Sequence, residues 1–414
     1  MGSCFTDLYL LREKRINDVV LLKEPDMVPF FPLASLYAPW YAGVSFKEAY
    51  EEPSAWLNAH MKMNQELQPD LLFNATSFLS SQVYQALDLK QLVWPGHGIS
   101  ENTPHQYSEA EYLLEKEYDE LINDPSDFVI RKYLPRTLGK MAPFSKLPPI
   151  SVFLFGYPAI ELVTLLNTTG MQEAWKVLTK AGEEASIWVT ARLKYEQEMT
   201  KLGFPLFTKG RATAPFDFIA DFLRGIKGSM MDIHRVPDKL LAVMDKVYPL
   251  ILLTALTMAK MGNNNRVYIP LHCGADGFMS EKHFDKFYWP QLKTLVLDLI
   301  REDMMPCLFY EGNWDSRLKY LAELPKAKTI GMFDRTDLAN VKKVLGNVMC
   351  ISGNMPADML KYGTVEQVEK YTKLLIETAG EGGGFIMSNA AIMDNAEPEL
   401  VRAWRDATRK YGVY

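Results

Sequence analysis

The sequence lacks the features that mark secreted and membrane-spanning proteins. Its four cysteines lie far apart and form no CxxC pair, so neither a disulfide framework nor a zinc ribbon is indicated. Charged residues interrupt the first 30 positions, where a signal peptide needs an apolar core. The longest apolar stretch, 151–167, is short for a membrane span and contains Gly, Pro and Glu. These absences predict a cytoplasmic protein without a membrane segment.

Concentrated positive charge is also missing. The 414 residues carry 45 Lys and Arg against 51 Asp and Glu, a net charge of −6, and no long basic run. Because nucleic acids and anionic membranes are bound by clustered positive charge, neither is expected as a partner. A content of 48% hydrophobic and 23% charged residues is typical of a soluble globular protein. The length allows two or three domains, or one large α/β barrel.

Short β-rich runs alternate with amphipathic stretches along most of the chain. This alternation predicts βα units around a parallel sheet, and eight such units close a (β/α)8 barrel. The predicted strands are 28–33, 70–75, 204–209, 267–272, 306–311, 329–334, 347–352 and 384–388. Ser280 is expected to cap one intervening helix, and Thr364 with Gln367 forms the capping box of another.

The region 88–201 does not follow this repeat. It contains a turn-rich stretch at 94–98, an expected acidic helix at 108–123, a Pro-punctuated segment and a further pair of helices. We interpret residues 1–414 as a single α/β barrel with 88–201 as an inserted helical segment. The insertion either serves as a lid over the site or only packs on the flank of the barrel.

In such barrels the chemistry lies where the carboxyl ends of the strands meet. His272 ends one predicted strand, and as neighbours on a strand His272 and Cys273 point to opposite faces, so they do not share a metal ion. His272 is the better candidate for a ligand, acid or base, with a structural histidine as the alternative.

Glu311 ends the next strand and shares a face with Phe309. A carboxylate among aromatic residues is either a metal ligand or an acid with a raised pKa, although an ion pair would also explain it. Asp334 and Arg335 end a further strand. They are candidates for the active site, or they pair with neighbouring residues in a structural role. Asn389 ends the last one.

Several segments resemble the uroporphyrinogen decarboxylase superfamily. Gly353-Asn354, Leu360 and 363–368 (GTVEQV) are similar to the family's G-N, leucine and G-T-x-E-x-V, although Pro356 stands one residue early. The segments 280–290 and 29–43 also resemble the family. The resemblance covers most of the chain outside 88–201 and implies a distorted (β/α)8 TIM barrel with its site at the carboxyl-terminal mouth. The family contains decarboxylases and corrinoid-linked methyltransferases, so the fold does not decide the function.

Two departures narrow the choice within the family. Its decarboxylases carry an arginine-rich segment that grips tetrapyrrole carboxylates, and the matching segment 29–43 contains no arginine. Its thiol methyltransferases hold zinc with an H-x-C pair and a distant cysteine. Here Phe309 and Glu311 replace the pair, and Ala390 or Ala391 replaces the last cysteine. Both activities are therefore disfavoured.

The remaining members transfer a methyl group from a substrate to the Co(I) of a separate corrinoid protein, and the resemblance implies this role. We expect an O-demethylase component that acts on a small apolar methyl donor, with phenyl methyl ethers favoured. His272 and Glu311 would protonate the leaving oxygen or hold a Zn²⁺ ion that binds it. Asn389 is the third predicted catalytic residue. The predicted substrate-binding residues are Phe31, Tyr37, Trp40, Phe73, Tyr310, Asn313, Trp314 and Asp334, with core packing as the alternative for each aromatic side chain.

Two other functions stay open. The first is a decarboxylase or lyase of a small apolar acid, with Arg211 or Arg335 holding the carboxylate. The second is a barrel that binds a corrinoid or porphyrinoid without chemistry. Because no cobalamin-binding domain is recognisable in the sequence, the corrinoid is expected to arrive on a partner protein.

Overall fold

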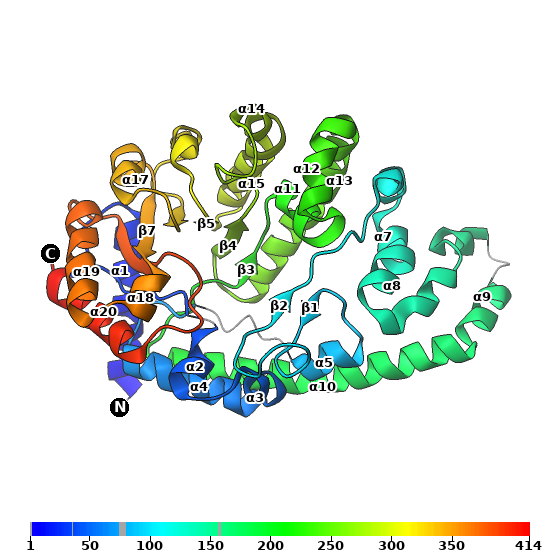
Figure 1. Ribbon diagram of the computed structural model, residues 1–414, viewed down its shortest axis with the longest axis horizontal. Helices are drawn as coiled ribbons and strands as arrows, with labels where there is room; N and C mark the ends of the chain where they lie inside the picture. The colour runs from blue at the N-terminus through cyan, green and yellow to red at the C-terminus, as the bar shows by residue number, and fades with distance from the viewer. Residues whose placement is uncertain (1, 35, 74–79, 156–158) are drawn as a thin grey trace.

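The computed structural model describes residues 2–34, 36–73, 80–155 and 159–414, and its fold is α/β (Figure 1). Six parallel strands form one sheet in the order β3-β4-β5-β6-β7-β8. They are β3 (Gly210–Arg211), β4 (Arg266–Leu271), β5 (Met305–Tyr310), β6 (Ile330–Phe333), β7 (Cys350–Met355) and β8 (Phe385–Asn389).

Two further extended segments join the open edges of this sheet. Phe31 donates to Met387 of β8 at 2.8 Å, and Asp70 donates to Phe30 at 2.8 Å. Leu72 then donates to Pro205 at 2.8 Å, just ahead of β3. Backbone hydrogen bonds thus run through eight extended segments and return to the first. The predicted α/β barrel fold is confirmed, and of the predicted strand 70–75, residues 74 and 75 lie outside the described residues.

Helices surround the ring and connect its strands. Before β3 they are α1 (Gly2–Val20), α2 (Tyr37–Ala42), α3 (Phe46–Glu51), α4 (Pro53–Leu67), α5 (Ser81–Ala86), α6 (Tyr118–Asn123), α7 (Pro125–Phe128), α8 (Leu134–Thr137), α9 (Ala159–Leu166) and α10 (Thr169–Lys201). After β3 they are α11 (Pro215–Phe218), α12 (Ile226–Arg235), α13 (Pro237–Met261), α14 (Glu281–His283), α15 (Trp289–Arg301), α16 (Leu318–Leu321), α17 (Leu338–Leu345), α18 (Ala357–Tyr362), α19 (Val365–Ala379) and α20 (Pro398–Tyr411). Short 3-10 and π turns link several of them.

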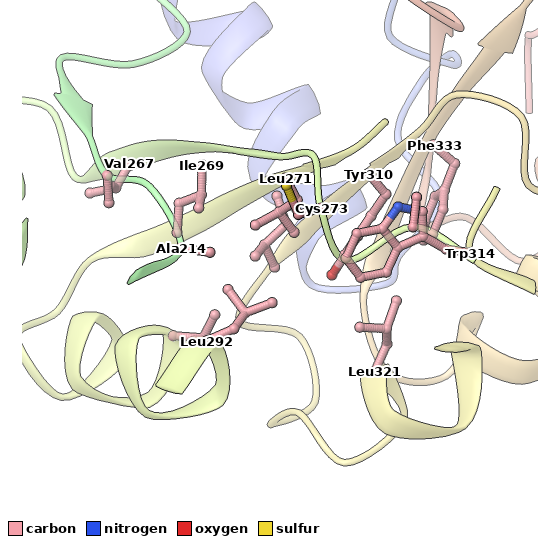
Figure 2. Packing of buried hydrophobic residues seen from close by; sticks show 14 of the residues in the cluster. Ala214, Val267, Ile269, Leu271, Cys273, Leu292, Tyr310, Trp314, Leu321 and Phe333 are labelled. Atoms are coloured by element: carbon pink, nitrogen blue, oxygen red, sulfur yellow. The ribbon is translucent and has the colours of Figure 1, made fainter. Parts of the chain in front are cut away.

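The strands separate two apolar layers, because side chains alternate between the faces of a strand. The inner layer fills the barrel and consists of Ile16, Val19, Val20, Phe31, Leu33, Leu71, Phe207, Cys307, Phe309, Ile330, Met332, Cys350 and Ile386. Leu271, Cys273, Tyr310 and Trp314 belong to the larger outer layer, where Leu292 and Leu321 of the surrounding helices cover them (Figure 2). This alternation decides which predicted site residues reach the mouth.

Both predicted helix starts are confirmed. The Ser280 hydroxyl accepts from the His283 amide at 3.3 Å. Thr364 and Gln367 cap each other, with the Thr364 amide 2.9 Å from the Gln367 side-chain oxygen and the Gln367 amide 3.3 Å from the Thr364 hydroxyl. Satisfying amides that have no partner within the helix fixes where each helix begins.

The predicted acidic helix at 108–123 is wrong over its first half. Helical structure starts only at the 3-10 turn Glu115–Glu117 that precedes α6. The amides of Tyr112 and Leu113 instead bond to the carbonyl of Leu223, and that of Ser108 bonds to Gln91. Tertiary hydrogen bonds thus take the backbone groups that a helix would have used.

The region 88–201 contributes none of the eight extended segments. Its strands β1 (Leu92–Val93) and β2 (Gln106–Tyr107) pair with each other in an antiparallel hairpin. Helix α10 runs along one side of the molecule, and α7, α8 and α9 lie near the end of α10 that is away from the sheet (Figure 1). The role of the region 88–201 as an insertion or lid stays a prediction.

Helix α13 is long and apolar enough, by length and composition only, to cross a membrane, and it is the one such helix among the described residues. One face, including Leu240, Val243, Met244 and Val247, is buried in the outer layer. A core helix of a soluble protein can meet the same criteria of length and composition, so this helix is weak evidence for a membrane span.

Candidate active site

A cavity of about 560 Å³ lies at the carboxyl end of β4. Its walls come from β3, β4, the turn after α11 and the hairpin β1–β2. Its lining residues are Tyr84, Leu89, Gln91, Leu92, His105, Tyr107, Glu109, Arg211, Ala220, Asp221, Phe222, Ile226 and His272. The cavity brings the predicted residue His272 together with residues from the region 88–201.

His272 is held between two carboxylates. Its Nδ1 lies 2.8 Å from Asp221, and its Nε2 lies 3.4 Å from Glu311. Burial lowers the pKa of His272, but the hydrogen bonds and charges of Asp221 and Glu311 outweigh it and raise the pKa to about 11. The imidazole is therefore protonated at neutral pH. Its Nδ1 is firmly bonded, whereas Nε2 is only loosely paired and faces the partly exposed Glu311.

The fully buried carboxylate of Asp217 holds the backbone of His272 and Cys273 in place. Asp217 accepts hydrogen bonds from the amides of His272 and Cys273, at 3.0 and 2.9 Å, and from the Tyr288 hydroxyl at 2.6 Å. Burial raises the pKa of Asp217 to about 6. Three donors on one carboxylate fix the chain where β4 ends, and so fix the direction in which His272 points.

The sequence reasoning missed both Asp217 and Asp221. They lie in α11 and the π turn Ile219–Arg224, which follow β3. Residues after the third strand meet at the same mouth as those after the later strands. Two carboxylates four residues apart, in the helical turn that follows the third strand, are the signal that identifies them.

The loop after β5 is shaped by the other predicted polar residues. Asp334 accepts the Gly312 amide at 2.9 Å, and burial raises the pKa of Asp334. Asn313 is exposed and accepts the Asp315 amide at 2.8 Å. Neither residue lines the cavity that contains His272. Their predicted contact with substrate stays untested, and the geometry shows them holding the loop that carries Glu311.

The donor set for a zinc ion is incomplete. Catalytic zinc sites hold the metal with three protein ligands. Here His272 Nε2 meets only one carboxylate, Glu311, because Asp221 binds the other ring nitrogen. Within the described ranges, no group of three or more His, Cys, Asp or Glu side chains could hold a metal ion. These residues do not fit a resident zinc ion.

Asn389 is occupied by backbone partners. Its Oδ1 accepts the Leu33 amide at 2.7 Å, and its Nδ2 donates to the Ala391 carbonyl at 2.5 Å. The residue is 1% exposed. It joins the end of β8 to Leu33 at the end of the first extended segment. The catalytic role that the sequence predicts for Asn389 stays a prediction.

The predicted aromatic pocket is divided between the two apolar layers. Phe31 and Phe73 face the barrel interior, where their ring centroids lie 6.0 Å apart. Tyr37, Tyr310 and Trp314 are fully buried in the outer layer. Trp40 lies under the ammonium group of Lys361, at 4.5 Å. The structure brings none of these six side chains to the wall of the cavity.

Comparison with known proteins agrees with this barrel. Residues 194–411, more than half of the chain, match the family uroporphyrinogen decarboxylase (URO-D). The chain therefore belongs to the uroporphyrinogen decarboxylase family. A uroporphyrinogen decarboxylase from Photorhabdus laumondii is 24% identical over 138 residues, which are 32% of this chain. The match spans only 38% of that relative's length.

A solved structure extends the likeness over nearly the whole chain. A methyltransferase from Methanosarcina mazei superposes with a TM-score of 0.61 over 97% of this chain and 98% of its own, at 14% sequence identity. At that identity the likeness establishes the fold. It covers most of the region 88–201, of which the family match reaches only residues 194–201.

Proposed function

We propose that this protein is an enzyme that transfers a methyl group from a phenyl methyl ether to the Co(I) of a separate corrinoid protein. The observation that carries the proposal is the position of His272, a protonated imidazole at the wall of a cavity with Nε2 left loosely paired. Membership of the uroporphyrinogen decarboxylase family and the fold shared with a methyltransferase support it.

The chemical difficulty is the leaving group. The reduced cobalt of the partner's corrinoid supplies the nucleophile that receives the methyl group. The bond between the methyl carbon and the ether oxygen breaks, and its electron pair stays on the oxygen. A phenolate is a poor leaving group unless that oxygen gains a proton in the transition state.

His272 provides this proton from Nε2. A donor with a pKa of about 11 is close to the pKa of about 10 of an ordinary phenol, so the proton passes between groups of similar basicity. Asp221 holds the ring through Nδ1 and stabilises its charged form, while Glu311 occupies Nε2 until substrate displaces it. The neutral imidazole then regains a proton from solvent, because the side chain is 31% exposed.

The test is a methyl-transfer assay with the purified protein, a reduced corrinoid protein encoded nearby and a panel of methyl ethers. The cobalt spectrum reports methylation. We expect His272→Ala to lose transfer by 100-fold or more on phenyl methyl ethers, within the range that a positioned general acid contributes. The control His283→Ala removes a histidine of α14 that lies outside the cavity, and this variant should retain methyl transfer. Absence of both partner binding and cobalt methylation with every ether would overturn the proposal.

A decarboxylase or lyase of a small acid is the second candidate. It is favoured by one observation, the presence of Arg211 in the same cavity as His272. Arg335 lies outside that cavity, with a side chain that is 82% exposed. Mass spectrometry of the products separates the two functions, since one removes a methyl group and the other releases carbon dioxide.

A further inference from the structure

His105 is a second histidine on the wall of the candidate active site, and it comes from the region 88–201. It directly precedes β2, which forms part of the same wall. The next residue but one, Tyr107, donates its hydroxyl hydrogen bond to the backbone carbonyl of Asp221, the residue that orients His272. This contact holds the hairpin β1–β2 against the turn after α11, and so fixes the place of His105 in the cavity wall.

The imidazole ring of His105 is held by a buried tyrosine. Its Nδ1 lies 2.8 Å from the hydroxyl of Tyr50, a residue of α3 that is fully buried. The Tyr50 ring stacks on Trp56, with centroids 5.4 Å apart, and packs edge-on against Trp94 at 5.8 Å. The ring of His105 itself lies 6.0 Å from Trp94. Because these aromatic rings pack on one another, the imidazole has one defined orientation.

The hydrogen bonds of Tyr50 fix which ring nitrogen of His105 carries the hydrogen. Burial raises the pKa of Tyr50, against a smaller lowering by a backbone hydrogen bond from His105, so the hydroxyl keeps its proton at neutral pH. A buried hydroxyl without an acceptor is costly, and Nδ1 is the acceptor at hand. Burial also lowers the pKa of His105, so its ring is neutral at neutral pH. Nδ1 is therefore bare, and Nε2 carries the hydrogen.

The Nε2 atom of His105 is open to the cavity. His105 lines the cavity and Tyr50 does not, so the edge of the ring that faces away from Tyr50 is the edge at the cavity. In the part of the chain that the structure describes, Nε2 makes no hydrogen bond, and it is not among the enclosed polar atoms that lack a partner. Apolar side chains share the wall with it, namely Leu89, Leu92, Ala220, Phe222 and Ile226. An N–H donor on such a wall suits one oxygen acceptor of an otherwise apolar molecule.

We propose that His105 is a specificity-determining residue whose Nε2–H binds a second, uncharged oxygen of the methyl donor, a phenyl methyl ether with a carbonyl or hydroxyl oxygen on its ring. This proposal rests on the proposed function and names its substrate class. His105 and His272 have different tasks, because His105 is a neutral donor and His272 is a charged acid. A compound without the second oxygen leaves Nε2–H without a partner beside apolar side chains, which weakens its binding. Tyr50 acts through His105 as a positioning residue.

The first test measures binding without any partner protein, so that it is independent of methyl transfer. Isothermal titration calorimetry compares the ortho, meta and para methoxyacetophenones with the matching isopropenylanisoles, in which a CH2 group replaces the carbonyl oxygen. We expect at least one ketone to bind roughly 5- to 10-fold more tightly than its isopropenyl counterpart, as for one hydrogen bond. His105→Phe should abolish this preference. His105→Gln replaces the donor with a side-chain amide and should keep part of it.

The second test reads the tautomer directly. Nitrogen-15 NMR of the histidine rings at neutral pH distinguishes a protonated ring nitrogen from a bare one, and the spectrum of His105→Gln assigns the signals of His105. We expect the hydrogen on Nε2 alone in the unaltered protein. In Tyr50→Phe we expect a mixture of both tautomers and a smaller preference for the ketones. A merely structural role of Tyr50 would lower stability without changing the tautomer.

The control His97→Phe removes a half-exposed histidine of the region 88–201 that lies outside the cavity, and it should keep the full preference. Equal affinities of every matched pair in the unaltered protein, no binding of any probe at millimolar concentration, or a hydrogen on Nδ1 would overturn the inference. An unchanged preference in folded His105→Phe would also overturn it, and the tautomer decides if that variant does not fold. Methyl transfer without a ketone preference would refute the inference alone. A ketone preference without methyl transfer would refute only the proposed function.

Discussion

The Nδ1 atom of His272 lies 2.8 Å from a carboxylate oxygen of Asp221, although the two residues are 51 positions apart in the chain. This contact joins the end of β4 to the π turn that follows β3. It fixes the orientation of the imidazole and favours its charged form. The orientation of the imidazole depends on this pair together with Asp217, which binds the amides of His272 and Cys273.

The first prediction concerns the pH dependence that Asp221 imposes. Because the pKa of His272 is raised to about 11, His272 stays protonated up to that pH, and a role as acid fails only as pH rises through it. Asp221→Asn removes the largest raising contribution, so the loss of activity at high pH should begin at lower pH. Rate profiles between pH 6 and 11 measure this. An alkaline limb at the same pH in both proteins would contradict the assignment.

The second prediction concerns stability through Asp217. Asp217→Ala leaves the amides of His272 and Cys273 buried without partners, and we expect the free energy of unfolding to fall by about 3 kcal/mol. Tyr288→Phe removes only one of the three donors and should cost about 1 kcal/mol. Urea denaturation monitored by circular dichroism measures both. Equal losses would show that Asp217 does not organise this turn.

Asp217 also gives stability a pH dependence. Its folded pKa of about 6 lies above the value of about 3.9 in an unfolded chain, so its protonated form is favoured by folding. Its contribution is fully present below pH 4 and is lost as pH rises through 6. Asp217→Asn should flatten this part of the stability profile, and an identical slope in both proteins between pH 4 and 7 would contradict the raised pKa.

A third prediction separates Tyr310 from substrate binding. Its hydroxyl is buried without a hydrogen-bond partner among the described residues. Tyr310→Phe removes this unsatisfied group, so stability should stay equal or rise by up to about 1 kcal/mol. KM for the methyl donor should be unchanged, because Tyr310 faces the outer layer. A several-fold rise in KM would instead place Tyr310 at the substrate.

A fourth prediction distinguishes a structural role of Asn389 from a catalytic one. Asn389→Ala removes two hydrogen bonds, one that accepts the Leu33 amide and one that donates to the Ala391 carbonyl just after β8. We expect the free energy of unfolding to fall by about 2 kcal/mol with kcat reduced less than tenfold. Denaturation and steady-state kinetics on the same preparation measure both quantities. A 100-fold loss of kcat at unchanged stability would restore the catalytic role that the sequence predicted.

Most strand positions were predictable because period-two apolar runs ending in Gly, Asn or Asp are a local signal, but β3 (Gly210–Arg211) lies just after the predicted strand 204–209. The same alternation was available for Tyr310, which lies between Phe309 and Glu311 and therefore faces away from them. The position of Asp217 and Asp221 after the third strand is visible in the sequence, but their bonds to His272 and Cys273 arise only when the turn after β3 folds back on β4. The prediction of a helix before α6 is wrong for a similar reason, because the carbonyl of Leu223 accepts the amides of Tyr112 and Leu113.

The central claim is that His272 donates a proton to the departing ether oxygen during methyl transfer to the corrinoid partner. The most direct measurement compares kcat/KM for phenyl methyl ethers whose phenols span a range of pKa, in the unaltered protein and in His272→Ala. If the claim holds, the variant loses most activity on ethers of weakly acidic phenols and little on those of strongly acidic phenols, which depart without a proton. A loss of the same factor across the whole series would contradict it.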